Sequence, residues 1–126
     1  MIHFVQYGLL LVLSIFLALH FLILLKFIPY NIVWGGRLKS DAEMYRFELV
    51  SIVINLFFLL IILVQSSILN LDFPQKIMTT LLWFMTALFA LNTIGNITSK
   101  NKIEQIYLTP ITVILTICSL ILALTN

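Results

Sequence analysis

Four long stretches without charge are the strongest constraint on how this chain can fold. Residues 1–25, 49–71, 77–99 and 105–126 contain no Asp, Glu, Lys or Arg. Each exceeds the ~18 apolar residues that mark a candidate membrane-spanning helix, and as a helix each can cross a hydrocarbon core ~30 Å thick. Because 62% of the residues are hydrophobic and only 10% are charged, the chain cannot cover a water-soluble surface. The sequence therefore predicts an all-α polytopic membrane protein, a single bundle of four transmembrane helices.

Local signals place the ends of these spans. The predicted spans cover about residues 4–28, 47–70, 76–99 and 103–125, and a long connection, 29–46, joins the first two. Pro29 disfavours helix in the residue before it. Ser40 and Glu43 have the spacing of a capping box, which predicts the start of the second helix. The first span has no basic residue before Lys26 and no small-residue cleavage site, so we expect an uncleaved span rather than a signal peptide.

The fourth span has two alternative starts. Thr109 and Pro110 are the residue types of an N-cap and a first helical position. A helix that began there would leave residues 102–108 as a short interfacial helix. Alternatively, one helix begins at Ile103 and is kinked at Pro110, which has no N–H to donate to the Ile106 carbonyl. We expect the kinked helix.

Basic residues are distributed unequally between the connections. Only Lys76 lies in the second connection, and the termini have no basic residue. Short loops rich in Lys and Arg stay in the cytoplasm. We therefore expect the first and third connections in the cytoplasm, the termini outside, and a bacterial inner membrane as the location. The charges are too few, and too close to the bilayer edges, for nucleic-acid binding. The basic residues of the first and third connections are Lys26, Arg37, Lys39, Arg46, Lys100 and Lys102.

Polar side chains within the spans fall into one layer. With Lys26, Arg46, Lys100 and Lys102 as markers of the cytoplasmic boundary and ~1.5 Å of rise per residue, each span places hydrogen-bonding groups about 6–13 Å below that boundary. Glu48 lies just above this layer, at its mouth. Unpaired polar groups are costly in hydrocarbon, so we expect these side chains to face the interior of the bundle. The residues of the layer are His20, Ser51, Asn55, Asn92, Thr93, Asn96 and Thr109.

Two interpretations of this layer stay open. Thr and Asn side chains also hold transmembrane helices together, by about 0.6 kcal/mol for each bond across an interface. We favour that interpretation for most of the third and fourth spans. A titratable His inside a span is, by contrast, a functional candidate. Glu48 is a second candidate, with an interfacial ion pair to Arg46, Arg37 or Lys26 as its alternative role.

The segment 29–48 contains six of the charged side chains in an otherwise apolar chain. Its sequence Trp34-Gly35-Gly36-Arg37 is explained by a tight turn, because glycine allows positive φ. The same glycines would let backbone amides approach a phosphate or carboxylate bound by Arg37. The nearby capped helix start is itself a site for anions. The candidate ligand-binding residues are therefore His20, Trp34, Gly35, Gly36, Arg37, Glu48, Ser51, Asn55, Asn92 and Asn96.

Other kinds of site find no support in the sequence. Cys118 is the only cysteine, which excludes an intrachain disulfide or a redox pair. His3 and His20 are too far apart on one helix to share a metal ion. No cofactor motif and no nucleophile–base–acid set is visible, so we expect neither a metal nor a cofactor. The first span also lacks the in-membrane Glu of small multidrug exporters, because that part of the chain reads VLSIF.

Three functions fit these features. The first is a protein that binds or transports a small amphipathic or anionic ligand in a polar pocket that opens to the cytoplasm under the 29–46 connection. The second is an accessory or structural subunit in a homo-oligomer or larger membrane complex, since a chain this small has little area to enclose a cavity. The third, ranked lowest, is an intramembrane isomerase or hydratase with Glu48 and His20 within hydrogen-bond or one-water reach. Membrane lipid is the expected partner in every case.

Overall fold

Four long α-helices make up most of the computed structural model, which describes residues 2–32 and 38–126. The last helix is preceded directly by a π-helical turn, η3, and with that turn each of the four is long and apolar enough to cross a bilayer. The predicted all-α architecture is confirmed: this is a four-span helical membrane protein. The elements are α1 (Ile2–Leu24), η1 (Tyr30–Ile32, a 3-10 turn), α2 (Asp41–Gln65), α3 (Gln75–Ile97), η3 (Glu104–Leu108) and α4 (Thr109–Thr125).

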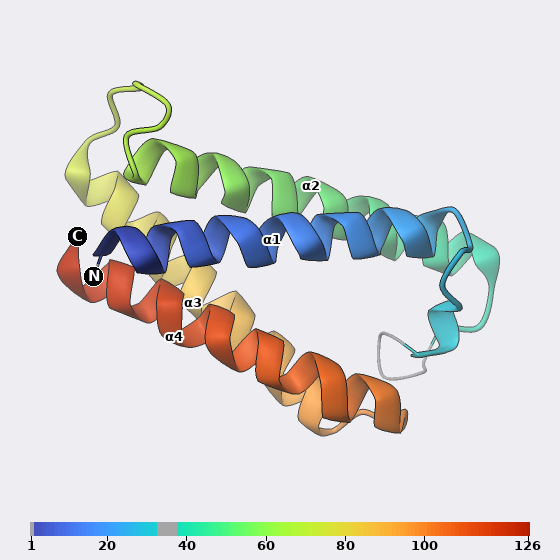
Figure 1. Ribbon diagram of the computed structural model, residues 1–126. Helices are drawn as coiled ribbons and strands as arrows, with labels where there is room; N and C mark the ends of the chain where they lie inside the picture. The colour runs from blue at the N-terminus through green and yellow to red at the C-terminus, as the bar shows by residue number, and fades with distance from the viewer. Residues whose placement is uncertain (1, 33–37) are drawn as a thin grey trace.

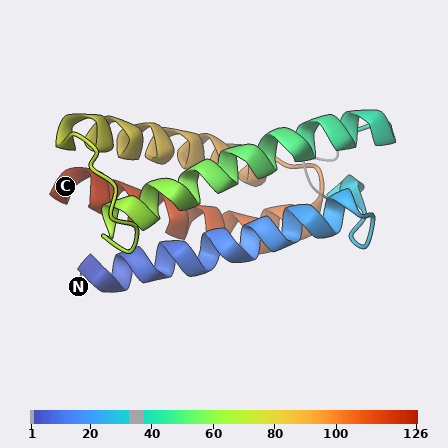
Figure 2. The ribbon, with the colours of Figure 1, turned by 90° about the horizontal axis from the view of Figure 1, so that it is seen from above.

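The helices pack as two antiparallel pairs. α1 lies beside α2 and α3 lies beside α4, and α1 also packs on α4. Figure 1 shows the two pairs close together at the end with both termini and farther apart toward the first connection. Seen from above, α2 crosses α1 obliquely (Figure 2). The two ends of the bundle are therefore packed differently, and this difference positions the candidate site.

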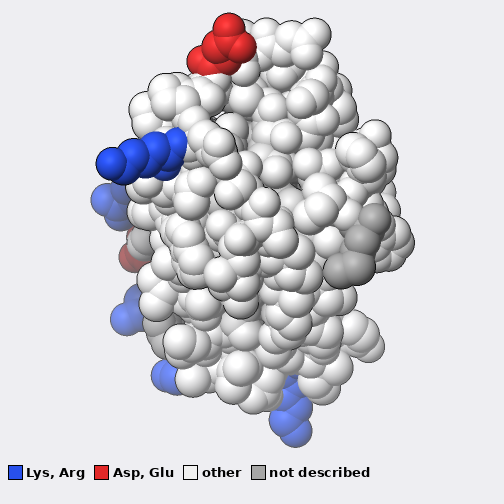
Figure 3. All heavy atoms as spheres, turned by 90° about the vertical axis from the view of Figure 1, so that its left-hand side faces the viewer, with Lys and Arg blue, Asp and Glu red and all other residues white. Residues whose placement is uncertain are grey.

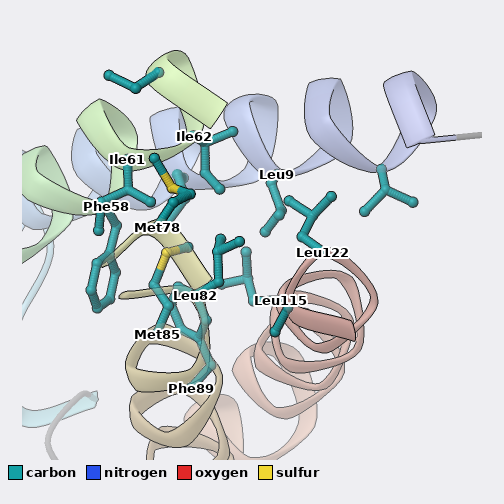
Figure 4. Close-up of a cluster of buried hydrophobic side chains, with 14 residues drawn as sticks. Leu9, Phe58, Ile61, Ile62, Met78, Leu82, Met85, Phe89, Leu115 and Leu122 are labelled. Atoms are coloured by element: carbon teal, nitrogen blue, oxygen red, sulfur yellow. The ribbon is translucent and has the colours of Figure 1, made fainter. Parts of the chain in front are cut away.

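The apolar core fills the end of the bundle that carries the termini (Figure 4). Leu9, Ile62 and Leu82 from three different helices are at most 1% exposed. At the inner limit of this core the rings of Phe58 and Phe89 meet edge to face, with centroids 5.2 Å apart. Beyond these rings the apolar packing gives way to the polar layer.

The outer surface of the helices is also apolar. Large side chains such as Phe4, Leu11 and Leu124 are more than half exposed. Figure 3 views the molecule from the end with the termini and shows uncharged atoms over most of that face. A soluble monomer rarely exposes apolar area so extensively, whereas a lipid bilayer requires it.

α1 ends at Leu24, before the predicted end near Ile28. Lys26 has a φ of 66°, and its N–H donates to the Ile23 carbonyl at 3.0 Å. The next N–H, that of Phe27, donates to Leu22 at 2.9 Å. These two bonds form a Schellman motif, which ends a helix where one residue turns left-handed. The chain has thus already left the helix before it reaches the proline.

The start of α2 follows the sequence prediction. Ser40 has an extended backbone, and its Oγ accepts a hydrogen bond from the Glu43 N–H at 3.2 Å. Lys26 Nζ donates to Asp41 Oδ2 at 2.6 Å, so the end of α1 is tied to the first turn of α2. That hydrogen bond is the main reason why the pKa of Lys26 is raised above its ordinary value. At its other end α2 stops at Gln65, earlier than the predicted end near Asn70.

The fourth span is one continuous helix, which agrees with the alternative of a single helix beginning near Ile103. Backbone helix runs from Lys102 through η3 into α4. Thr109 has helical dihedral angles, φ −59° and ψ −49°, which excludes it as an N-cap because an N-cap is extended. The π turn ends at Leu108, two residues before Pro110, whose missing N–H interrupts the normal bonding pattern.

Side-chain hydrogen bonds connect the helices near the termini. Gln6 donates to Gln65 Oε1 at 2.7 Å, and Nδ1 of His3 lies 3.1 Å from Gln6 Oε1. Asn126 donates to Thr79 Oγ1 at 2.8 Å. These contacts hold α1 to α2 and α3 to α4 at the tightly packed end.

Candidate functional site

A cavity of about 450 Å³ lies in the half of the bundle toward the first connection. Its walls come from the C-terminal halves of α1 and α3, the middle of α2, and η3 with the start of α4. The volume is within the ~300–1,000 Å³ typical of small-molecule sites. The cavity is lined by apolar side chains, Phe16, Leu88 and the Phe58–Phe89 pair among them, and by one group of polar ones. The polar lining residues are His20, Ser51, Asn55, Asn92, Asn96, Glu104 and Thr112.

His20 and Glu48 meet at one wall of this cavity. Nδ1 of His20 and Oε2 of Glu48 are 2.6 Å apart, a distance typical of a charge-assisted hydrogen bond. The Glu48 side chain is 0% exposed, whereas that of His20 is 20% exposed. When Nδ1 donates to the carboxylate, Nε2 remains as the ring nitrogen available to a ligand. The buried carboxylate thus orients an imidazole that lines the cavity.

The helical repeat of α2 explains why Glu48 belongs to this wall. Glu48, Ser51 and Asn55 follow one another at i, i+3 and i+7, which places them on one face of the helix. The sequence expected Glu48 at an open mouth, but the side chain is fully buried. A small apolar cluster at the loop end of the cavity contains Leu38 and Met44, which lie close to Glu48 in the chain.

Three polar side chains of the cavity have no hydrogen-bond partner among the described residues: Ser51, Asn55 and Asn92. Asn55 as a residue is only 6% exposed, and its carboxamide, which is not among the fully buried unpartnered groups of the described chain, is reached from the cavity. Most Thr residues of the helices donate back to a carbonyl one turn earlier, as Thr86 and Thr93 do, but Ser51 does not. Ser51 is half-buried and Asn92 is exposed, so the rule that buried polar groups are normally satisfied bears on Asn55 alone. These three side chains are therefore free to bond a molecule in the cavity.

Other members of the polar layer are satisfied within the protein. Asn96 Nδ2 donates to Thr112 Oγ1 at 3.2 Å, and Thr93 Oγ1 lies 3.4 Å from Thr116 Oγ1. Both contacts join α3 to α4, which agrees with the helix-packing interpretation of these two spans. Thr109, which the depth argument also included, keeps a buried hydroxyl without a partner in the described part of the chain and is not among the cavity-lining residues.

Glu104 is a cavity residue that the sequence reasoning did not single out. It is 2% exposed and lines the cavity from η3, with Leu108 and Thr112 at successive four-residue steps. Because Glu104 lies close to Lys100 and Lys102 in the sequence, its position alone suggested the bilayer edge. The sequence signal that could have found it is its spacing, four and eight residues before Leu108 and Thr112, which places the three on one helical face.

Part of the predicted site falls outside the described residues. This applies to Trp34, Gly35, Gly36 and Arg37. Of the remaining candidates, Glu48 bonds to His20, and the others line one cavity: His20, Ser51, Asn55, Asn92 and Asn96. Over residues 2–32 and 38–126, no group of three or more His, Cys, Asp or Glu side chains has the arrangement of a metal site.

Compared with protein-family models, with curated proteins and with solved structures, the chain matches none of them. The cavity and its polar groups are therefore the basis for the functional argument.

Proposed function

We propose that this protein binds a small, neutral amphipathic molecule in the cavity between its four helices. With the orientation expected from the basic loops, the cavity lies in the cytoplasmic half of the bilayer. The observation that carries the proposal is Asn55, a residue 6% exposed on the wall of a cavity of about 450 Å³, whose carboxamide has no hydrogen-bond partner among the described residues.

The chemistry of the lining favours an amphipathic ligand. The Phe58–Phe89 pair and Phe16 provide apolar contact area for a hydrocarbon body. Ser51 and Asn55 are one helical turn apart and face the same space, where a hydroxyl and a carboxamide can each donate and accept. Such groups suit a neutral head, such as an alcohol, an ester or an amide. An anionic ligand, the other class that the sequence suggested, would depend on Arg37.

Photo-cross-linking with a long-chain alcohol that carries a diazirine beside its hydroxyl tests this proposal. The protein in mild detergent is equilibrated with the probe and irradiated, and the modified peptides are identified by mass spectrometry. We expect labels on the α2 face around Ser51 and Asn55 and loss of these labels in Asn55→Leu. Thr79→Val, which removes a hydrogen bond at the opposite end of the bundle, is the matched control and should label like the natural protein.

Two outcomes would overturn the proposal. One is labelling spread evenly over the lipid-facing surfaces and unaffected by Asn55→Leu. The other is selective labelling by the long-chain carboxylate with the same diazirine but not by the alcohol, which would assign an anionic ligand to the cavity.

The contact between His20 and Glu48 favours one second function, proton transfer to or from the bound molecule. An imidazole held at 2.6 Å by a carboxylate has the geometry of a general base with its orienting group. An isomerase of this type would exchange a carbon-bound hydrogen of its substrate with water. Membrane lipid extract incubated with the protein in deuterated buffer should then gain carbon-bound deuterium. Equal incorporation with the natural protein and with Glu48→Gln would exclude this function.

A further inference from the structure

We infer that the cavity opens sideways into the bilayer between α2 and α3, and that its ligand is a molecule dissolved in the membrane. This inference rests on the proposed function and adds to it the route and the source of the ligand. Of the neighbouring helix pairs, α2 and α3 pack least closely.

Exposure of the lining residues differs between the walls. On the α2 side, Val50 lines the cavity and is 53% exposed, and on the α3 side Leu91 lines it and is 62% exposed. On the opposite walls, Ile23 of α1 is 1% exposed and Thr112 of α4 is 2% exposed. A residue that both lines a cavity and is exposed at the surface lies at an opening. The opening is therefore between α2 and α3.

The depth of this opening places it in hydrocarbon. Val50 is four residues beyond Arg46 on α2, which corresponds to ~6 Å below the charged boundary. Leu91 is nine residues before Lys100 on α3, which corresponds to ~13 Å. Both depths lie inside an apolar layer whose half-thickness is ~15 Å. A molecule that enters here comes from the lipid phase.

The loop end of the cavity is covered by side chains instead. Ile23, Leu38 and Met44 form a buried apolar cluster there, and Leu108 packs against it. Ile23 and Leu108 also line the cavity, so the cluster forms its roof. Near this roof the first and third connections are in contact, because Asn101 Nδ2 donates to the Asn31 carbonyl at 3.4 Å. A direct path from the cytoplasm would have to displace these groups.

The chemistry of the opening suits a molecule with a polar head. Asn92 lies there on α3 as an exposed carboxamide without a hydrogen-bond partner in the described chain. A polar group on a lipid-facing surface is unfavourable, so its position is explained if the head of an entering molecule bonds to it. Gly95, one helical turn further along α3, leaves the passage wide: a Cβ built on it meets no atom within 4 Å.

Two variants change the width of the opening in opposite directions. Gly95→Leu adds a side chain in open space and should slow entry, whereas Leu91→Ala removes one and should speed it. Each has a matched control on α1 outside the cavity. Gly8→Leu also adds a side chain in open space, and Leu11→Ala removes one that is 64% exposed, against 62% for Leu91.

The measurement is the rate at which the diazirine alcohol, supplied from donor vesicles, labels the Asn55 peptide in protein reconstituted in phosphatidylcholine vesicles. We expect Gly95→Leu to slow labelling about tenfold, which corresponds to roughly 1.4 kcal/mol on the barrier. Leu91→Ala should accelerate it, and the α1 controls should match the natural protein. If both α3 variants are labelled at the rate of the natural protein, the inferred lateral opening is wrong, but the proposed binding of the ligand is not contradicted. If the natural protein shows no label at Asn55 even at equilibrium, the proposed function itself fails.

Discussion

Asn55→Leu should make the ligand-free protein more stable while abolishing binding in the cavity. Asn55 is 6% exposed, and its carboxamide has no hydrogen-bond partner in the described residues. A polar residue in such a position lowers the stability of the ligand-free protein, and its presence is explained if a ligand bonds to it. Leucine has a similar size and no polar atoms, so it removes the desolvation cost without opening a large void.

The size of the effect follows from the surroundings of the side chain. A buried amide without a hydrogen bond costs about 1–3 kcal/mol in protein mutational data. The lower end applies here, because Asn55 faces a cavity rather than packed side chains. A gain of about 1 kcal/mol should raise the Tm by about 4 °C in a chain of this length. Asn96→Leu is the matched control, since Asn96 donates to Thr112 at 3.2 Å. Loss of this hydrogen bond should lower the free energy of unfolding by about 0.6 kcal/mol and lower the Tm.

Thermal unfolding in one detergent, followed by circular dichroism after removal of extractable lipid, measures both variants. Addition of the long-chain alcohol should raise the Tm of the natural protein and leave that of Asn55→Leu unchanged, because only a protein that binds is stabilised. The reasoning is refuted if Asn55→Leu is destabilised as much as Asn96→Leu. Asn55 would then be a packing residue like the other Asn and Thr residues of the layer.

Three further predictions concern single contacts. His20→Phe removes the hydrogen bond to Glu48 and should cost about 1.5–3 kcal/mol, seen as a lower Tm in detergent. Ser67→Gly should stabilise by about 1 kcal/mol, because Ser67 has a φ of 64°, whereas Ser66→Gly, at a φ of −84°, should not. The pKa of Lys26 is raised above 10.5 in the folded protein, so the stability from its ion pair is complete below that pH and lost as pH rises through the folded pKa. Unfolding in denaturant at alkaline pH should therefore show a loss that Lys26→Met lacks.

For each of these three predictions, one result would contradict it. An unchanged Tm in His20→Phe would mean that the contact with Glu48 contributes nothing to stability. Equal effects of glycine at positions 66 and 67 would contradict the backbone argument. The same alkaline loss in Lys26→Met would assign that loss to another group.

Some of this structure was predictable because its causes are local. The four helices follow from uncharged stretches of sufficient length, since a bilayer leaves the backbone no partner except itself. The start of α2 follows from Ser40, whose side chain bonds within its own first turn. α1 and α2 end at Leu24 and Gln65, earlier along the chain than predicted. Apolar sequence continues beyond both residues, and the signal for each end is a residue with positive φ shortly after it, Lys26 and Ser67.

The sequence by itself thus determined the membrane class and the number of candidate spans, because length and hydropathy are properties of single segments. Only the tertiary structure decided which polar groups meet. Asn55 and Asn96 are the same residue type and line the same cavity, yet Asn96 donates to Thr112 whereas Asn55 has no hydrogen-bond partner among the described residues. Glu104 lines the same cavity, at successive four-residue steps from Leu108 and Thr112. Whether a polar side chain is satisfied depends on neighbours from other helices, and these are fixed only when the helices pack.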